Sequence, residues 1–465
     1  MQPKGTTLPV IIVGAGPCGL VAALTLQQNH IPFVILEKAS RERICTNAGS
    51  GFDMAKTALN ILGDRLKATT DDILLYHGGL LFSTLEGDVY RDSPMVAQES
   101  KRKKTQKTKN LEENFRMASA NRSELQKLLL DQLFPNKSQD EEGILRCSVT
   151  VESYVEEDET KVVVTLSDQS TVTGCALLGC DGVHSKVRAC MHKGKEDPLH
   201  FCNTNCYWAK TPMPSGSEVE REVEQMQTYK KTGGGVTVIL GTGTKKRPGT
   251  FFLAPTTGQV LWGIFEQATE PPQTSNDLTR RGGGILTEPE KQEMIVKFLG
   301  GGDDDKNWTL AKTVMEHTPA HAITKTGLFD RQNLDLPYTS PGKLVALLGD
   351  AAHPQTPFLG QGVNMAITDA YVYATRIAKA IQNNDADTIP RAMARCDTKR
   401  RRQQAKRLVI EARRRCDASV SGHWFTVWMM KMLFKYTPMT WLIKDALVGD
   451  KSNKEMVDEL DKEYA

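Results

Sequence analysis

The sequence has few long hydrophobic runs and no strong excess of either charge. Hydrophobic residues make up 39% of its 465 positions, and the mean hydropathy is −0.39. These values argue against a protein with many membrane spans, because each span needs about 20 consecutive apolar residues. The formal net charge is only +3, so the molecule lacks the strongly basic balance that is typical of nucleic-acid-binding proteins.

The cysteines lack the spacing of a zinc site. All ten are scattered along the chain, and Cys202 and Cys206 are close without a second pair or a histidine cluster to complete a ligand set. We therefore expect reduced thiols, a cytoplasmic location and no bound metal. The apolar run Val10–Val13 is too short for the core of a signal peptide, and we interpret it as a strand.

A glycine-rich turn follows this strand and opens a helical pattern. Gly14 permits a tight turn, Gly16 lets a pyrophosphate approach the backbone, and Gly19 lets helix and strand pack closely. A second apolar strand, Phe33–Leu36, ends at Glu37. The separation between Gly14 and Glu37 is close to the roughly 20 residues expected between the glycine turn and a ribose-binding acid. The pattern predicts a dinucleotide site on a parallel sheet covered on both faces, and it leaves NAD and FAD both open.

Two further motifs follow predicted strands. In the first, Asp181 would either bind a ligand or only cap a turn. The second begins at Gly349-Asp350, after the strand Leu344–Leu348, and a glycine-containing loop then opens a helix near Gly362. An acid at this place can accept hydrogen bonds from sugar-like hydroxyls, and the helix start presents N–H donors and a positive dipole end.

These motifs, in this order, resemble those of the flavoprotein monooxygenases related to p-hydroxybenzoate hydroxylase, which are single-component aromatic hydroxylases and epoxidases. The second motif of that family is matched by Asp181, Gly182, Ser185 and Arg188. The third is matched by Gly349, Asp350, Pro357, Gly362 and Asn364. A helix that the family has between its first two motifs is matched by Arg122, Leu125 and Leu129.

The resemblance implies an α/β fold with a Rossmann-type FAD-binding domain built on a parallel sheet, a mixed β-sheet substrate domain and a helical C-terminal region. The expected boundaries are 1–194 for the first part of the FAD-binding domain, 195–345 for the substrate domain, 346–410 for the returning part of the FAD-binding domain and 411–465 for the C-terminal region.

The resemblance also implies which residues hold FAD. Glu37 would hold the adenosine ribose, Arg122 the phosphates or the ribityl chain, and Asp350 the ribityl or phosphate-bridging groups. The backbone from Gly360 to Asn364, including Val363, would face the pyrimidine edge of the flavin. The other cofactor-binding residues expected, from the three motifs and from the flavin-covering segment near 47–54, are Gly14, Gly16, Gly19, Arg43, Gly51, Asp181, Gly362 and Asn364.

The implied reaction uses non-covalent FAD, NADPH or NADH as a transient co-substrate, and O2. A flavin C4a-hydroperoxide would hydroxylate or epoxidise a small lipophilic or aromatic substrate in a pocket that excludes water. Two alternatives stay open. One is an FAD-dependent reductase of the geranylgeranyl-reductase kind, and the other is a non-enzymatic binding protein on the same fold, as in the prenyl-GTPase escort proteins.

Tyr229 and His353 are the candidates for direct catalytic roles. Tyr229 precedes a lysine pair and a glycine run, and a tyrosine near such a loop could hydrogen-bond a substrate or donate a proton. His353 lies inside the third motif, where it is either structural or in contact with substrate or flavin. The other aromatic residues of the middle unit, which we expect mostly in its core, are Tyr207, Trp208, Phe252, Trp262 and Phe265.

Shorter patterns place further elements. Lys161–Leu166 and Thr171–Leu178 read as a β-pair, Thr257-Gly258 as a hairpin turn, and Thr287 with Glu290 as a capping box.

Two segments have more than one interpretation. Lys101–Lys109 is strongly basic and is either a solvated loop or a nuclear-import patch. Trp424–Phe434 is apolar and aromatic but too short to span a bilayer. It is either a helix packed over the substrate domain or an interfacial helix on an intracellular membrane, which basic residues upstream such as Arg400–Arg402 would favour.

Overall fold

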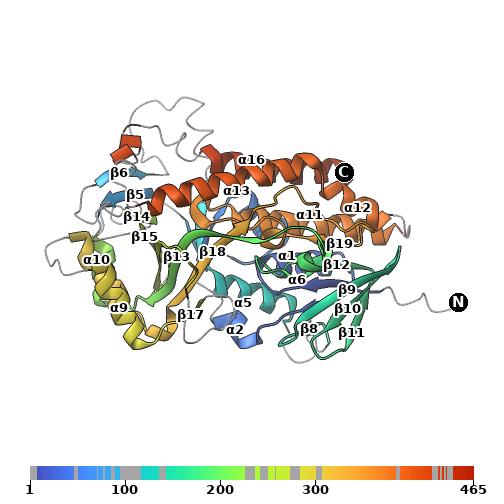
Figure 1. Cartoon of the computed structure of the whole chain (residues 1–465), viewed down its shortest axis with the longest axis horizontal. Coiled ribbons are helices and arrows are strands. Elements are labelled where there is room, and N and C mark those ends of the chain that lie inside the picture. The colour runs from blue at the N-terminus through green and yellow to red at the C-terminus, as the bar shows by residue number, and fades with distance from the viewer. Residues whose placement is uncertain are drawn as a thin grey trace.

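The computed structural model of the chain shows two units, each built around its own sheet (Figure 1). It describes residues 8–46, 51–70, 72–76, 79–84, 89–94, 117–135, 143–225, 236–240, 250–256, 258–272, 283–299, 306–383, 388–421, 428–429, 432–433, 436 and 444–464. Tyr229, the basic segment 101–109 and most of the aromatic segment 424–442 lie outside the described residues.

The first unit is built on a parallel sheet of five strands, as the sequence predicts. In spatial order these are β19 (Val345–Leu347), β12 (Ala176–Gly179), β1 (Val10–Val13), β2 (Phe33–Leu36) and β8 (Leu145–Arg146). All four residues of β1 and of β12 are buried, and this explains why these strands are apolar throughout instead of alternating.

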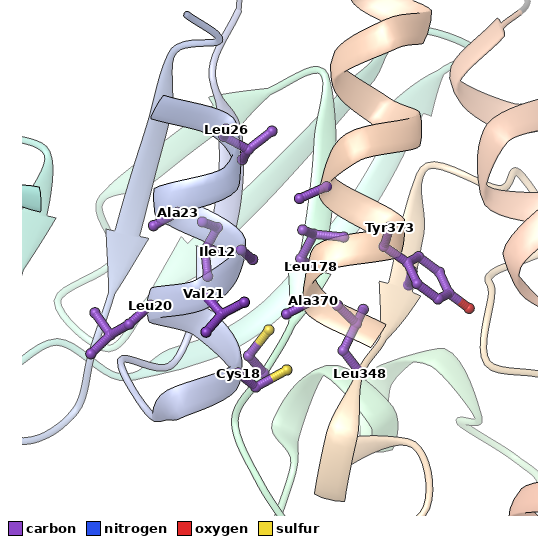
Figure 2. Packing of buried hydrophobic residues seen from close by; sticks show 14 of the residues in the cluster. Ile12, Cys18, Leu20, Val21, Ala23, Leu26, Leu178, Leu348, Ala370 and Tyr373 are labelled. Atoms are coloured by element: carbon purple, nitrogen blue, oxygen red, sulfur yellow. The ribbon is translucent and has the colours of Figure 1, made fainter. Parts of the chain in front are cut away.

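Helix α1 (Pro17–Gln28) packs on this sheet, and α5 (Arg122–Leu133) and α11 (Gly362–Gln382) pack against α1. Figure 2 shows α1 and α11 side by side, with Val21 and Ala23 from the first and Ala370 and Tyr373 from the second in one buried layer. The chain therefore returns to its first domain after about residue 345, and the third motif lies next to the first.

A small antiparallel sheet packs against β1 and β12. Its strands are β9 (Val151–Asp158), β10 (Lys161–Leu166) and β11 (Thr171–Gly174). The predicted pairing of β10 with all of 171–178 is wrong in its second half, because the chain leaves β11 and enters the parallel sheet as β12. Gly174 permits this crossing, since a Cβ there would lie 2.5 Å from the carbonyl oxygen of Pro9.

The second unit has an eight-stranded sheet in which only β14 and β5 pair in parallel. In spatial order its strands are β17 (Gly283–Ile285), β18 (Thr324–Arg331), β13 (Leu199–Pro212), β16 (Gln259–Gln267), β15 (Thr250–Thr256), β14 (Val236–Leu240), β5 (Gly79–Thr84) and β6 (Val89–Pro94). Because β5 and β6 precede residue 195, the range 1–194 contributes strands to both units.

Helices α7 (Glu218–Gln225), α9 (Glu288–Leu299) and α10 (Lys306–Glu316) form a buried core with one face of this sheet. The predicted capping box is confirmed, because the backbone N–H and the hydroxyl of Thr287 both donate to Glu290 Oε2 (2.7 and 2.8 Å). The predicted turn between β15 and β16 is also present, with Gly258 at a φ of 71°.

The remaining elements surround the junction of the two units. A three-stranded sheet joins β3 (Gly51–Ala55), β7 (Met117–Asn121) and β4 (Leu74–Tyr76). The other helices are α2 (Arg41–Thr46), α3 (Lys56–Asn60), η1 (Ile61–Arg65), α6 (Lys186–Met191), η2 (Ala320–Ala322), η3 (Gly349–Ala351), η4 (Pro357–Leu359), α12 (Thr388–Cys396), α13 (Lys399–Val420) and α16 (Lys444–Tyr464). Within the described part of the chain, no helix has both the length and the hydrophobicity to cross a bilayer.

Candidate cofactor site

The glycine-rich turn between β1 and α1 has no room for side chains. Gly14 has a φ of 104°, and a Cβ there would lie 2.5 Å from the carbonyl oxygen of Cys180. A Cβ on Gly19 would lie 1.9 Å from the carbonyl oxygen of Gly14. Among the described residues no side chain caps α1 at Gly16, so the first N–H groups of this helix are available to an anion.

Glu37 is held against this turn. Its Oε2 accepts a hydrogen bond from the backbone N–H of Ala15 (2.6 Å), and its Oε1 accepts one from Ala39 (2.7 Å). Each carboxylate oxygen keeps a further acceptor position after these bonds. The carboxylate is thus oriented beside the α1 start, where a ribose hydroxyl could reach it.

Arg122 begins α5 and is tied to the same turn. The side chain of Asn121 caps α5 by accepting from Ser123 N (3.0 Å). Arg122 Nε donates to Gln126 Oε1 (3.2 Å), and Gln126 Nε2 donates to the carbonyl of Ala15 (2.9 Å). A Cβ on Gly16 would lie 3.7 Å from the Arg122 guanidinium, so the cation stands beside the uncapped helix start.

Asp350, which follows β19, places a negative charge near Arg122. The side chains of Arg122 and Asp350 are both exposed, yet protein surrounds them closely enough to affect their titration. Desolvation lowers the pKa of Arg122, with Asp350 and Glu37 opposing the shift. Desolvation also raises the pKa of Asp350, against the effect of His353 and Arg122. The charges of Glu37, Arg122 and Asp350, which come from segments far apart in the sequence, therefore lie close enough to affect one another.

The start of α11 lies next to Asp350. Gly360 adopts the left-handed conformation (φ 62°), and a Cβ on Gly362 would lie 3.8 Å from Asp350 Oδ1. Val363 is half-buried there, and none of the described side chains caps the helix at Gln361. The N–H groups of the first turn of α11 are therefore directed to the region of Asp350. In the same way, those of α1 are directed to the region of Arg122.

Asn364 joins the α11 start to the strand β3. Its Oδ1 accepts from Ala55 N (2.7 Å), and its Nδ2 donates to the carbonyls of Gly360 (2.6 Å) and Asp53 (3.2 Å). The side chain is fully engaged within the protein, so only its backbone would be free for a cofactor. Gly51, at the start of β3, packs closely, since a Cβ there would lie 2.3 Å from Leu261 Cδ1.

The second motif caps a helix and braces the third. Asp181 Oδ2 accepts from the N–H groups of Lys186 (2.7 Å) and Val187 (3.2 Å). One of its two carboxylate oxygens therefore has the capping role that the sequence left open. Its Oδ1 is buried and has no partner among the described residues, and desolvation raises the pKa of the carboxyl. Arg188 is buried, pairs with Asp197 (2.7 Å) and donates to the carbonyl of Ala352 (2.6 Å).

His353 points into the protein beneath the third motif. It is 1% exposed, and its Nε2 lies 2.7 Å from Asp369 Oδ2. Asp369 also accepts from Gly349 N (3.2 Å) and from Arg401 (2.8 Å). Burial opposes the charged form of Asp369, but Arg401 and His353 outweigh it and lower the pKa to about 2. The geometry gives His353 a structural position, and its predicted catalytic role remains a prediction.

The two faces of the second sheet differ. Trp262 is fully buried on the face with α9 and α10, where its Nε1 donates to Thr211 Oγ1 (2.9 Å). Alternate residues of β16 point the other way. On that face Phe265 contacts Trp208 and Phe358, with ring centroids 5.0 and 4.7 Å apart. Phe358 belongs to the third motif, so this aromatic cluster (Trp208, Phe265 and Phe358) connects the second sheet to the α11 start.

Arg43 is exposed on α2, and Tyr229 is not among the described residues. Sequence reasoning missed Phe358, although it stands between the Pro357 and Gly362 of the third motif. Its position inside the motif was the signal that could have identified it.

A family model described as an FAD binding domain matches residues 7–247 and 309–409, which is more than half of the chain. FAD-dependent monooxygenase penM of Penicillium crustosum is 26% identical over 379 residues, covering 80% of this chain and 70% of that protein. The dual trans-enoyl reductase/FAD-dependent monooxygenase tazHJ of Aspergillus terreus (strain NIH 2624 / FGSC A1156) is 24% identical over 381 residues, covering 82% of this chain and only 48% of that longer protein. Klebsiella pneumoniae HpxO, solved in complex with FAD and uric acid, has the same fold, with a TM-score of 0.72 at 17% identity over 96% of this chain and 97% of that one.

Proposed function

The chain belongs to the family of proteins with this FAD-binding domain, and we propose that it is a flavoprotein monooxygenase that uses FAD, NADPH or NADH, and O2 to hydroxylate or epoxidise a small organic molecule. The observation that carries the proposal is the convergence of the α1 start, Arg122 and Asp350 from three separate motifs. A relative that is similar over 80% of this chain is named an FAD-dependent monooxygenase.

The residues present fit FAD. The close approach at Gly14 and Gly19 leaves backbone, without side chains, beside the α1 start, which suits a pyrophosphate. Asp181 Oδ1 is a buried acceptor without a partner among the described residues, which suits a cofactor hydroxyl. Glu37 would hold the adenosine ribose, Arg122 the phosphates and Asp350 the ribityl hydroxyls.

FAD, when bound, supplies electron transfer from the nicotinamide and the activation of O2. The protein supplies binding, orientation and electrostatics. The N–H groups at the start of α11 present a positive dipole end that would stabilise negative charge on the flavin pyrimidine ring. Asn364 holds this helix start against β3, and the aromatic cluster closes the site towards the second sheet and excludes water.

We propose a substrate that is aromatic or lipophilic. The part of the second sheet nearest to the α11 start presents aromatic rings, and such rings favour flat apolar molecules through burial and edge or stacking contacts. HpxO, solved with uric acid bound, has the same fold. Uric acid is flat but polar, so it agrees with a flat substrate and does not support a lipophilic one.

The test is to purify the protein, precipitate it with acid and assay the supernatant for flavin. We expect FAD to be released, because the site residues would hold it by hydrogen bonds and charges and not by a covalent bond. NADPH and NADH oxidation is then screened against phenolic, indolic and terpenoid compounds with O2 uptake recorded. A colourless protein with no affinity for FAD would support the binding-protein alternative, and reduced products without O2 uptake would support the reductase.

Contact with an intracellular membrane surface is a second proposal, which concerns location and not chemistry. Trp428, Met429 and Tyr436 are 50, 47 and 71% exposed and follow the basic helix α13 in the sequence, and exposed aromatic residues near basic segments are typical of interfacial binding. Co-sedimentation with vesicles of phosphatidylcholine and phosphatidylserine should decrease for Trp428→Ser. Equal, negligible sedimentation of both proteins would favour a purely cytoplasmic location.

A further inference from the structure

The C-terminal helix α16 lies along α11 and α13 on the outside of the first unit (Figure 1). Ion pairs and hydrogen bonds hold it along its length. Asp461 pairs with Arg65 (2.5 Å), Glu463 pairs with Arg376 (2.8 Å), and Ser452 donates to Gln404 (2.8 Å). These contacts fix the helix relative to the elements that carry the candidate site.

One residue of α16 packs directly on the start of α11. Gly449 is buried, and a Cβ there would lie 2.6 Å from Oε1 and 3.0 Å from Cδ of Gln361. Gln361 is only 1% exposed and occupies the N-cap position of α11, and its Oε1 has no hydrogen-bond partner among the described residues. Its amide is therefore confined by the backbone of α16 and not by a polar contact.

The next residue of α16 is hydrogen-bonded to α3, the helix that follows β3. Asp450 Oδ1 accepts from Thr57 N (3.0 Å), and Thr57 Oγ1 donates to the carbonyl of Asp450 (3.3 Å). Thr57 lies two residues after Ala55, the end of β3, which Asn364 joins to the α11 start. Adjacent residues of α16 thus contact the residue that begins α11 and the helix α3 that follows β3.

We infer that Gly449 and Asp450 are positioning residues, through which α16 sets the orientation of the α11 start relative to β3 and so the affinity and electronic environment of FAD. The inference rests on the proposed function. Gly449 is needed because only a helix position without a side chain lets the Gln361 amide lie against α16. Glycine is a poorer helix former than alanine, so helix stability does not explain its presence here.

The experiment compares Gly449→Val, Gln361→Ala, the double variant and Lys451→Val. Lys451 is exposed on the same helix, so its valine variant controls for a β-branched residue in α16. The readouts are the Kd of FAD for the flavin-free protein, the visible spectrum of bound FAD and its reduction potential. Circular dichroism and thermal unfolding establish that each variant is folded.

Gly449→Val should raise the Kd of FAD about tenfold if the conformation that binds FAD falls to about a tenth of the protein population. It should also shift the flavin spectrum. Lys451→Val should match the wild type. The double variant should return to the Kd of Gln361→Ala, because removal of the amide leaves space for the valine. In the same way, Asp450→Asn should keep the wild-type Kd, since it retains the acceptor for Thr57, and Asp450→Ala should not.

A folded Gly449→Val protein with wild-type Kd and spectrum would overturn the inference. So would a double variant as impaired as Gly449→Val, since that would mean general damage to α16. Failure of the wild type itself to bind FAD would instead overturn the proposed function.

Discussion

Arg122 and Asp350 illustrate how single residues define the candidate site. Both are exposed, and both have pKa values shifted in the direction that desolvation dictates. Among the described residues, neither side chain forms an ion pair within 4 Å. Charged side chains whose pKa values are shifted by desolvation are typical of ligand sites. FAD would offer its phosphates to Arg122 and its hydroxyls to Asp350.

Asp350→Ala should lose FAD. The loss of an acceptor for cofactor hydroxyls costs about 1–3 kcal/mol, which corresponds to a Kd increase of about 5- to 150-fold. The flavin content of the purified variant and a titration with FAD measure this. Asp350→Asn is the control, because it keeps one acceptor oxygen, and its Kd should lie between those of the other two proteins. Full flavin content in the alanine variant would remove Asp350 from the cofactor site.

Asp369 supports the third motif from below, and its titration predicts a pH dependence. Its folded pKa of about 2 lies below the unfolded value of about 3.9. Its stabilisation is therefore present above pH 3.9 and is lost as the pH falls towards 2. Asp369→Asn should lower the free energy of unfolding at pH 7 by about 3 kcal/mol, because His353 and Arg401 lose a buried partner.

Denaturant unfolding at a series of pH values between about 5 and 3 tests this, since that range includes the unfolded carboxyl pKa. The stability of the wild type should fall more steeply than that of Asp369→Asn. Asp335→Asn is the matched control, because Asp335 is 75% exposed in its pair with Lys406 and should change stability by less than about 1 kcal/mol. Parallel pH profiles for the wild type and Asp369→Asn would contradict the role of Asp369.

At the scale of elements, the local signals in the sequence predicted the first unit well. The apolar strands β1 and β2, the glycine turn and the Arg122 helix each follow from a pattern within one element. The division of 171–179 into β11 and β12 could not be predicted, because the apolar pattern continues through Cys175 and only the distant partners of each half differ. The addition of 79–94 to the second sheet is non-local for the same reason.

The candidate site shows the same limit. Motif spacing identified Arg122, Asp350 and the α11 start, because each lies in a short ordered block. It could not show that Asn364 uses its side chain on β3, or that Phe358 reaches Phe265 across the two units. Nor could any local pattern connect Gly449 with Gln361, since the contact exists only once α16 has packed.

The two faces of the second sheet predict different outcomes for two phenylalanines. Phe265→Ala opens the aromatic cluster towards the α11 start, so water should enter and product per NADPH oxidised should fall as hydrogen peroxide rises. Phe251 is equally buried but stacks on Trp262 on the other face. Phe251→Ala should lose comparable stability, about 3–5 kcal/mol, with unchanged coupling. Equal coupling in both variants would place the substrate away from the cluster.

At the scale of the whole molecule, the first unit supplies the charges and helix starts for a cofactor, and the second supplies an apolar face over them. Each unit has its own core, and they meet through the aromatic cluster, β3 and α13. This division predicts that changes in the second unit alter substrate fit while FAD remains bound, and that changes in the first alter FAD binding itself.

The central claim is oxygen transfer, and the most direct measurement is the fate of isotopically labelled O2. The purified protein is supplied with FAD, NADPH, labelled O2 and the compound that most stimulates NADPH oxidation in the screen, and the product is analysed by mass spectrometry. A monooxygenase should form a product that carries one labelled oxygen atom, with equal consumption of NADPH and O2. A product that is reduced, or that contains oxygen only from water, would contradict the central claim.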